Sequence, residues 1–155
     1  MKLDCTNFYD EIEAFAAFPE KITNVTAEEF KKVFGCEAAE KSKEVVYVWR
    51  SERKIKILKG ESDILYIGQT KQSFRDRYYK YAGMHATSKA NSLKFKHIID
   101  IYGAITISVA HFSKFADSLQ KAEGQLLWWY FQNHCEYPPI NYTQTKIRND
   151  AFQLL

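Results

Sequence analysis

The chain has 155 residues, of which 46% are hydrophobic, 26% charged and 15% aromatic. This length is typical of one domain, and the apolar content excludes an intrinsically disordered chain. No apolar run approaches the roughly 18 residues that cross a bilayer, so we expect no membrane partner. The first ten residues lack the basic and apolar blocks of a signal peptide. The sequence therefore predicts an intracellular protein, either cytoplasmic or nucleoid-associated.

Charge is distributed unevenly along the sequence. Residues 1–40 contain 4 basic and 9 acidic side chains, whereas residues 41–100 contain 14 basic and 6 acidic ones, a net charge of +8. A basic segment of this size favours a polyanion such as nucleic acid as the partner. The alternative is an unevenly charged but simply solvated surface.

The acidic segment contains two predicted helices. Apolar residues recur at helical spacing over residues 7–18 and stop before Pro19. A capping-box pattern at Thr26 opens a second helix, which is expected to end near Gly35. Residues 1–42 are therefore predicted to be a helical N-terminal extension.

The rest of the chain mixes strand and helix patterns. β-Branched, aromatic or alternating residues predict strand segments at 45–49, 54–57, 64–68 and 104–112. Apolar residues at helical spacing predict helices at 73–81, 89–101 and 116–133. We therefore expect an α+β fold with a small central antiparallel sheet of about three strands, flanked by helices.

An acidic residue lies on the apolar side of the last predicted helix. Leu119, Leu126 and Tyr130 form one stripe, and Glu123 lies about 40° from Leu119, near the middle of that stripe. Because unpaired carboxylates are rarely buried, Glu123 either pairs with a buried cation or faces a cleft and binds a ligand. Mg²⁺ suits a lone carboxylate, since it keeps several water ligands. The pattern alone leaves both alternatives open.

The predicted helix at 73–81 has two distinct faces. Arg77 and Tyr81 lie one turn apart on one face, and Phe74 and Tyr78 share another. A guanidinium beside a phenol can hold a phosphate group. The alternative is a surface arginine stacked on a tyrosine.

Together these motifs resemble the GIY-YIG nuclease family. Val45-Val46-Tyr47 stands where the family has Gly-Ile-Tyr, and Tyr66-Ile67-Gly68 matches the second half of the name without change. Arg77 follows nine residues after this motif, where the family places its arginine. Later family elements match at Tyr81, at Glu123 and at the closing Pro138-Pro139-Ile140-Asn141. The first motif lacks its glycine, and the 19-residue gap from Tyr47 to Tyr66 is longer than the usual family spacing.

The resemblance covers roughly residues 43–145 and leaves residues 146–155 as a tail. It implies a divalent-metal-dependent endonuclease that hydrolyses DNA phosphodiester bonds, of restriction, mobile-element, viral or repair type. Glu123 is expected to hold Mg²⁺ or Mn²⁺, and Arg77 to stabilise the phosphate charge. Tyr47 is the expected general base, with His85 as its rival. The remaining expected site residues position the water or the phosphate or order the site: Tyr66, Tyr81 and Asn141.

Basic and polar side chains near the two tyrosine motifs are the expected DNA contacts: Arg50, Arg53, Lys54, Lys56, Gln69, Lys71 and Arg75. The basic insertion at 50–59 has a simpler alternative as a hairpin extension. Two other functions remain open. One is a non-catalytic nucleic-acid-binding module on the same fold. The other is an α+β protein-interaction domain that presents the aromatic run at 128–130.

Overall fold

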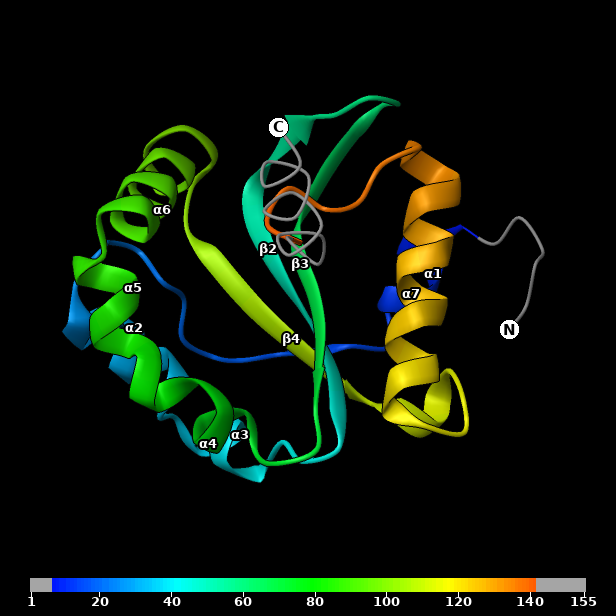
Figure 1. Ribbon diagram of the computed structural model, residues 1–155, viewed down its shortest axis with the longest axis horizontal. Helices are drawn as coiled ribbons and strands as arrows, with labels where there is room; N and C mark the ends of the chain where they lie inside the picture. The colour runs from blue at the N-terminus through cyan, green and yellow to red at the C-terminus, as the bar shows by residue number, and fades with distance from the viewer. Residues whose placement is uncertain (1–6, 142–155) are drawn as a thin grey trace, which may run out of the picture.

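A four-stranded antiparallel sheet lies at the centre of the computed structural model, which describes residues 7–141 (Figure 1). The strands follow the order β1-β4-β2-β3, with bounds Ala16–Ala17 (β1), Val45–Lys56 (β2), Glu61–Thr70 (β3) and Ile105–His111 (β4). The α-helices are Phe8–Ile12 (α1), Ala27–Phe34 (α2), Glu37–Lys41 (α3), Phe74–Tyr78 (α4), Ala82–Thr87 (α5), Lys89–Tyr102 (α6) and Leu119–His134 (α7). Two 3₁₀ turns, Tyr79–Tyr81 (η1) and Phe112–Lys114 (η2), complete the described elements. The α+β prediction is confirmed, with one strand more than expected.

The two strand segments predicted at 45–49 and 54–57 form one strand. The first half of β2 pairs with both neighbours, whereas its outer end pairs only with β3. The register of the β2–β3 pair shifts after Trp49 and again before Ile55. A strand with a bulge bends but stays continuous. Because a bulge inserts an extra residue into the strand, the alternation of polar and apolar residues along the sequence is interrupted there.

The helix predicted over 7–18 was wrong beyond its first turns. The helix α1 ends at Ile12, and Ala16 and Ala17 then form β1, whose partner is β4. The backbone pairing continues as Phe18 N donates to Ile107 O at 2.7 Å. The exposed edge of β4 offers unpaired backbone groups, and satisfying them outweighs the weak helical periodicity of this short segment.

Two apolar cores cover the two faces of the sheet. Helices α2, α4, α5 and α6 lie on one side of it in Figure 1, and α7 lies on the other with α1. Because side chains alternate along a strand, Tyr47 and Trp49 of β2 enter the first core, while Val46 and Val48 enter the second. Segments from the N-terminal extension therefore contribute to both cores.

The predicted ends of the helix that follows Thr26 agree closely with the structure. Thr26 caps α2 by accepting from Glu29 N, and Gly35 follows its last residue, as expected. The Glu29 carboxylate accepts from Thr23 rather than completing the capping box. None of the helices formed by residues 7–141 is long and apolar enough to cross a membrane. The tail predicted at 146–155 lies outside this range.

Candidate functional site

Tyr47 and Gly68, one residue from each tyrosine motif, face each other across the β2–β3 ladder. A Cβ atom at Gly68 would lie 2.6 Å from the Tyr47 hydroxyl oxygen and 2.7 Å from two ring carbons. Glycine therefore leaves the space that the Tyr47 ring occupies. The second motif owes its glycine to this close approach and not to an unusual backbone angle.

The hydroxyl of Tyr47 is buried and hydrogen-bonds to the hydroxyl of Tyr78. Burial, followed by the neighbouring phenols of Tyr78 and Tyr66, raises the pKa of Tyr47 well above its usual value. Tyr78, and not Tyr47, lines the nearby cavity. This position does not favour Tyr47 as a group that touches water directly. Its expected role as general base stays a prediction.

A cavity of about 330 Å³ brings together three of the expected catalytic residues, Tyr66, Arg77 and Tyr81. Its wall is completed by residues from β2, α4, α5, α6 and the closing segment: Trp49, Tyr78, Met84, His85, Lys94, Phe95 and Ile140. A volume of this size is at the lower end of the range for small-ligand sites, about 300–1,000 Å³. The second tyrosine motif, the segment of Arg77 and Tyr81, and the closing motif thus meet at one concave site, whereas Tyr47, Glu123 and Asn141 do not line it.

Arg77 is held at the cavity by aromatic rings. Its guanidinium carbon lies 5.5 Å from the ring centre of Tyr78 and 5.9 Å from that of Tyr81, in cation–π range. Arg77 and Tyr81 lie close together as predicted, although the helix predicted over 73–81 is divided into α4, which holds Arg77, and η1, which holds Tyr81. By contrast, Arg50 pairs with Asp63 at 2.8 Å and Arg75 with Glu40 at 3.6 Å. Within residues 7–141, no carboxylate forms an ion pair with Arg77, which leaves its charge available to an anion.

Glu123 lies at the border of the buried face of α7 rather than at its middle. The buried side chains of this helix are Ala122, Gln125, Leu126, Trp129, Tyr130 and His134, and Glu123 is half-buried beside them. Burial raises the pKa of Glu123, and no cation or hydrogen-bond donor among residues 7–141 lowers it. The pKa of Tyr66 is raised by burial and then by the charge of Glu123, while Arg77 lowers it. Glu123 and Arg77 therefore both act electrostatically on Tyr66.

The half-buried carboxylate of Glu123 is a suitable ligand for a hard divalent cation. Mg²⁺ commonly takes one or two protein carboxylates and fills its other positions with water or phosphate oxygens. The described residues contain no cluster of three or more histidine, cysteine or acidic side chains. A metal bound here would have Glu123 as its protein ligand. Mg²⁺ and Mn²⁺ accept such a site, whereas other metal ions prefer several protein ligands.

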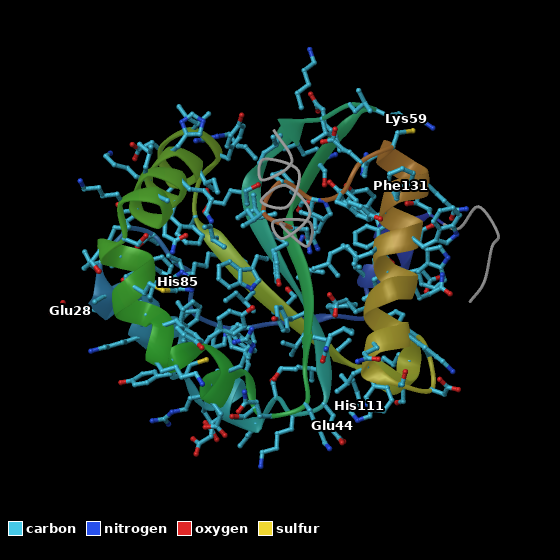
Figure 2. The ribbon with its side chains drawn as sticks, in the orientation of Figure 1. Glu28, Glu44, Lys59, His85, His111 and Phe131 are labelled. Carbon is cyan, nitrogen blue, oxygen red and sulfur yellow. The ribbon has the colours of Figure 1, made fainter. Side chains whose placement is uncertain are left out.

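His85 lies on the side of α5 that faces the sheet (Figure 2), among the rings of Phe30, Phe34, Trp49 and Phe95. Both ring nitrogens are buried and have no hydrogen-bond partner within residues 7–141. Burial and then the charge of Lys94 lower the pKa of His85 to about 4. The imidazole is therefore neutral at pH 7 and a weak proton acceptor.

Asn141 orders the strand that carries Tyr66. Its side-chain oxygen accepts from Ile67 N at 3.0 Å, and its amide nitrogen donates to Ile67 O at 2.8 Å. The preceding residue, Ile140, donates its backbone N–H to Leu65 O at 2.9 Å. The closing motif thus fastens to the free edge of β3. These hydrogen bonds favour the ordering role expected for Asn141, and its role toward a phosphate stays a prediction.

The expected DNA contacts fall into three groups. Gln69 and Lys71 line an open depression together with Arg77, next to the main cavity. Lys54 and Lys56 are exposed at the outer end of β2. The three arginines already have partners within the described chain: Arg50 and Arg75 pair with carboxylates, and Arg53 donates to Ile101 O at 2.9 Å.

Apart from His85, the rival base, six cavity residues were not predicted as site residues, and three of these have polar or charged groups: Trp49, Tyr78 and Lys94. Trp49 follows Tyr47 by two residues in β2, so strand periodicity alone places it on the same face. Tyr78 was predicted only to share a helical face with Phe74, and both are buried, while Tyr78 also lines the cavity. Nothing in the sequence distinguishes Lys94 from the other lysines of the basic segment.

Comparison with known proteins adds no relative. No protein-family model matches the chain, and no curated protein or solved structure shows significant similarity to it. The resemblance to GIY-YIG nucleases therefore stays a prediction from the sequence motifs.

Proposed function

We propose that the protein is a divalent-metal-dependent endonuclease that hydrolyses DNA phosphodiester bonds at this cavity, with an active site of the GIY-YIG type. One observation carries the proposal. A cation, Arg77, and a carboxylate, Glu123, both act on Tyr66, and neither has an oppositely charged partner within the described chain. A phosphate bound to Arg77 and a metal ion bound to Glu123 would supply the missing partners.

The proposal gives each residue a role that its position supports. Arg77 binds the phosphate and stabilises the charge that develops on its oxygens, helped by the low-dielectric aromatic surroundings. Tyr66 and Tyr81 line the same cavity, where their hydroxyls would hydrogen-bond the phosphate or orient the attacking water. Tyr47 acts through Tyr78, whose hydroxyl it holds in place.

Glu123 would hold Mg²⁺ or Mn²⁺. When bound, such an ion supplies Lewis-acid stabilisation of phosphoryl and leaving-group oxygens. The exposed lysines of β2 and the depression with Gln69 and Lys71 extend the cationic surface away from the cavity, where a DNA backbone can follow it.

The decisive experiment compares Glu123→Gln with the wild-type protein in plasmid cleavage, with Mg²⁺ and with chelator. The variant should lose cleavage and still bind DNA. Glu61→Gln is the matched control, because Glu61 is exposed at the start of the strand that carries Tyr66. Full activity of Glu123→Gln would refute the proposed metal role. DNA binding without cleavage by the wild type would instead favour the non-catalytic module.

The same variant has a second readout in the stability of the metal-free protein. Burial raises the pKa of Glu123 in the folded state above its value in the unfolded chain, which is about 4.3. The contribution of this carboxyl group to the stability of the fold therefore falls as the pH rises from about 4.3 through the folded-state pKa. At pH 7 the ionised carboxylate therefore destabilises the fold, and Glu123→Gln should melt at or above the wild-type temperature. This difference should vanish below about pH 4. Mg²⁺ should raise the melting temperature of the wild type only.

A further inference from the structure

The cavity has an aromatic and apolar part, which we call its inner part and which phosphate hydrolysis does not require. Arg77 and Tyr66 supply the groups that a phosphate needs. The remaining wall contains Trp49, Phe95 and Met84, and these side chains play no part in the proposed hydrolysis. The rings of Trp49 and Phe95 lie nearly parallel, with centres 5.9 Å apart and planes 27° apart. A flat, apolar ligand surface matches such a wall.

Two side chains in this wall carry polar atoms that are buried without partners. Trp49 is 3% exposed and its indole Nε1 makes no hydrogen bond within residues 7–141. The two ring nitrogens of His85 are in the same state. Buried polar atoms are nearly always paired. Other unpaired buried atoms occur in α7, but among residues 7–141 only these three belong to residues that line the cavity, where a bound ligand could pair with them. A neutral imidazole provides one donor and one acceptor, and an indole provides one donor.

The charges at the cavity specify the other half of that ligand. Arg77 and Lys94 both line it, which favours an anion. A ligand that combines an anionic group with a flat ring bearing hydrogen-bond donors and acceptors is a nucleotide. Aromatic side chains that stack on bases and cations that hold the backbone are the usual combination in proteins that bind single strands.

We propose that the inner part of the cavity binds the base of an unpaired nucleotide whose phosphate lies at Arg77. This rests on the proposed function for the phosphate and adds a preference for the structure of the substrate. A base inside a duplex cannot reach Trp49 and His85 without leaving the stack, which costs free energy. The enzyme therefore acts at single-stranded or extruded nucleotides in preference to continuous duplex.

The first test measures binding in chelator, so that no cleavage occurs, by fluorescence anisotropy of labelled oligonucleotides. It compares a short single strand, its duplex, and a strand of equal length in which every nucleotide is abasic. The abasic strand keeps the phosphates and sugars and removes the bases. We expect the single strand to bind at least about fivefold more tightly than the abasic strand, the gain typical of stacking one base. Equal affinity of the two strands would overturn the base pocket.

A variant at His85 separates the bases from the phosphate. His85→Phe keeps an aromatic ring among its four aromatic neighbours and removes both nitrogens. The affinity for the single strand should fall about two- to tenfold, as for one lost hydrogen bond, while that for the abasic strand stays unchanged. His97→Phe is the control, because His97 is exposed on α6. Unchanged single-strand affinity in a folded His85→Phe protein would refute the role of His85.

A second measurement needs no variant. Trp49 lies in the cavity wall, so deoxythymidine monophosphate should change the tryptophan emission of the wild-type protein, and deoxyribose 5-phosphate should not. Identical responses to the two would count against the pocket.

Failure of the proposed function looks different: Arg77→Ala would then leave cleavage in Mg²⁺ and affinity for both strands unchanged. Loss of the base preference with cleavage intact overturns only the inference drawn here.

Discussion

Substituting Gly68 by alanine perturbs the contact that joins the two tyrosine motifs. The added Cβ would lie 2.6 Å from the Tyr47 hydroxyl, whereas ordinary contacts begin near 3.4 Å, so the ring must move by about 0.8 Å. Tyr47 is 1% exposed and packs against Phe74, Tyr78 and Tyr66. The ring has no free space in which to relax.

Overpacking a closed core of this kind typically costs about 1–3 kcal/mol. For a domain of this size each kcal/mol lowers the melting temperature by about 2–4 °C, so we expect a loss of about 2–12 °C. The displaced Tyr47 would also release the hydroxyl of Tyr78 at the cavity. Plasmid cleavage should therefore fall by more than the loss of folded protein explains.

Thermal unfolding followed by circular dichroism measures the first effect, and cleavage at a temperature where the variant is folded measures the second. Gly124→Ala in α7 and Gly83→Ala in α5 are matched controls, since an added Cβ meets nothing within 4 Å at either position. Alanine should stabilise those helices by roughly 0.5–1 kcal/mol. A Gly68→Ala protein with wild-type melting and cleavage would refute the argument that this glycine makes room for Tyr47.

Three further changes test other parts of the site. Tyr47→Phe should lower turnover by about tenfold or less, as for one lost hydrogen bond; a loss of 10²–10⁴-fold would restore Tyr47 as the general base. Asn141→Ala removes both bonds to Ile67 and should lower the free energy of unfolding by about 1–3 kcal/mol in a denaturant titration; an unchanged midpoint would contradict the clamp. Replacing Lys54 and Lys56 by glutamine should reduce the slope of log affinity against log salt by about 2, and an unaltered slope would remove both lysines from the DNA contact.

Long-range pairing explains which parts of the fold the sequence could predict. The helix at α7 and the strand at β4 have clear local periodicity, and both were predicted within a few residues. The two-residue strand β1 has no local signal, because it exists only through its pairing with β4. The helical pattern at residues 7–18 is compatible with either conformation over its second half. Whether this second half forms a helix or a strand depends on β4, which is distant in the sequence.

The site shows the same division between local and long-range information. The pairing of Arg77 with Tyr81 follows from helical spacing, and the structure places both at one cavity. The burial of Tyr47 depends on α4, which packs over it, and no local pattern in β2 indicates that its hydroxyl meets Tyr78. Likewise, the inward face of α7 is set by its packing on the sheet. Glu123 consequently lies at the border of the buried surface rather than at its centre.

The acidic N-terminal segment belongs to the site as much as the basic segment does. Phe30 and Phe34 of α2 contact His85, and Phe34 also contacts Trp49 and Tyr78, with ring centres 5.4–5.8 Å apart. The apolar face of α2 thus supports the wall of the cavity. Its exposed acidic residue Glu28 lies at the outer edge of the molecule, away from the sheet (Figure 2). Helix α2 carries two acidic and two basic residues, Glu28 and Glu29 against Lys31 and Lys32, so its contribution to the site comes from its aromatic face and not from a net charge.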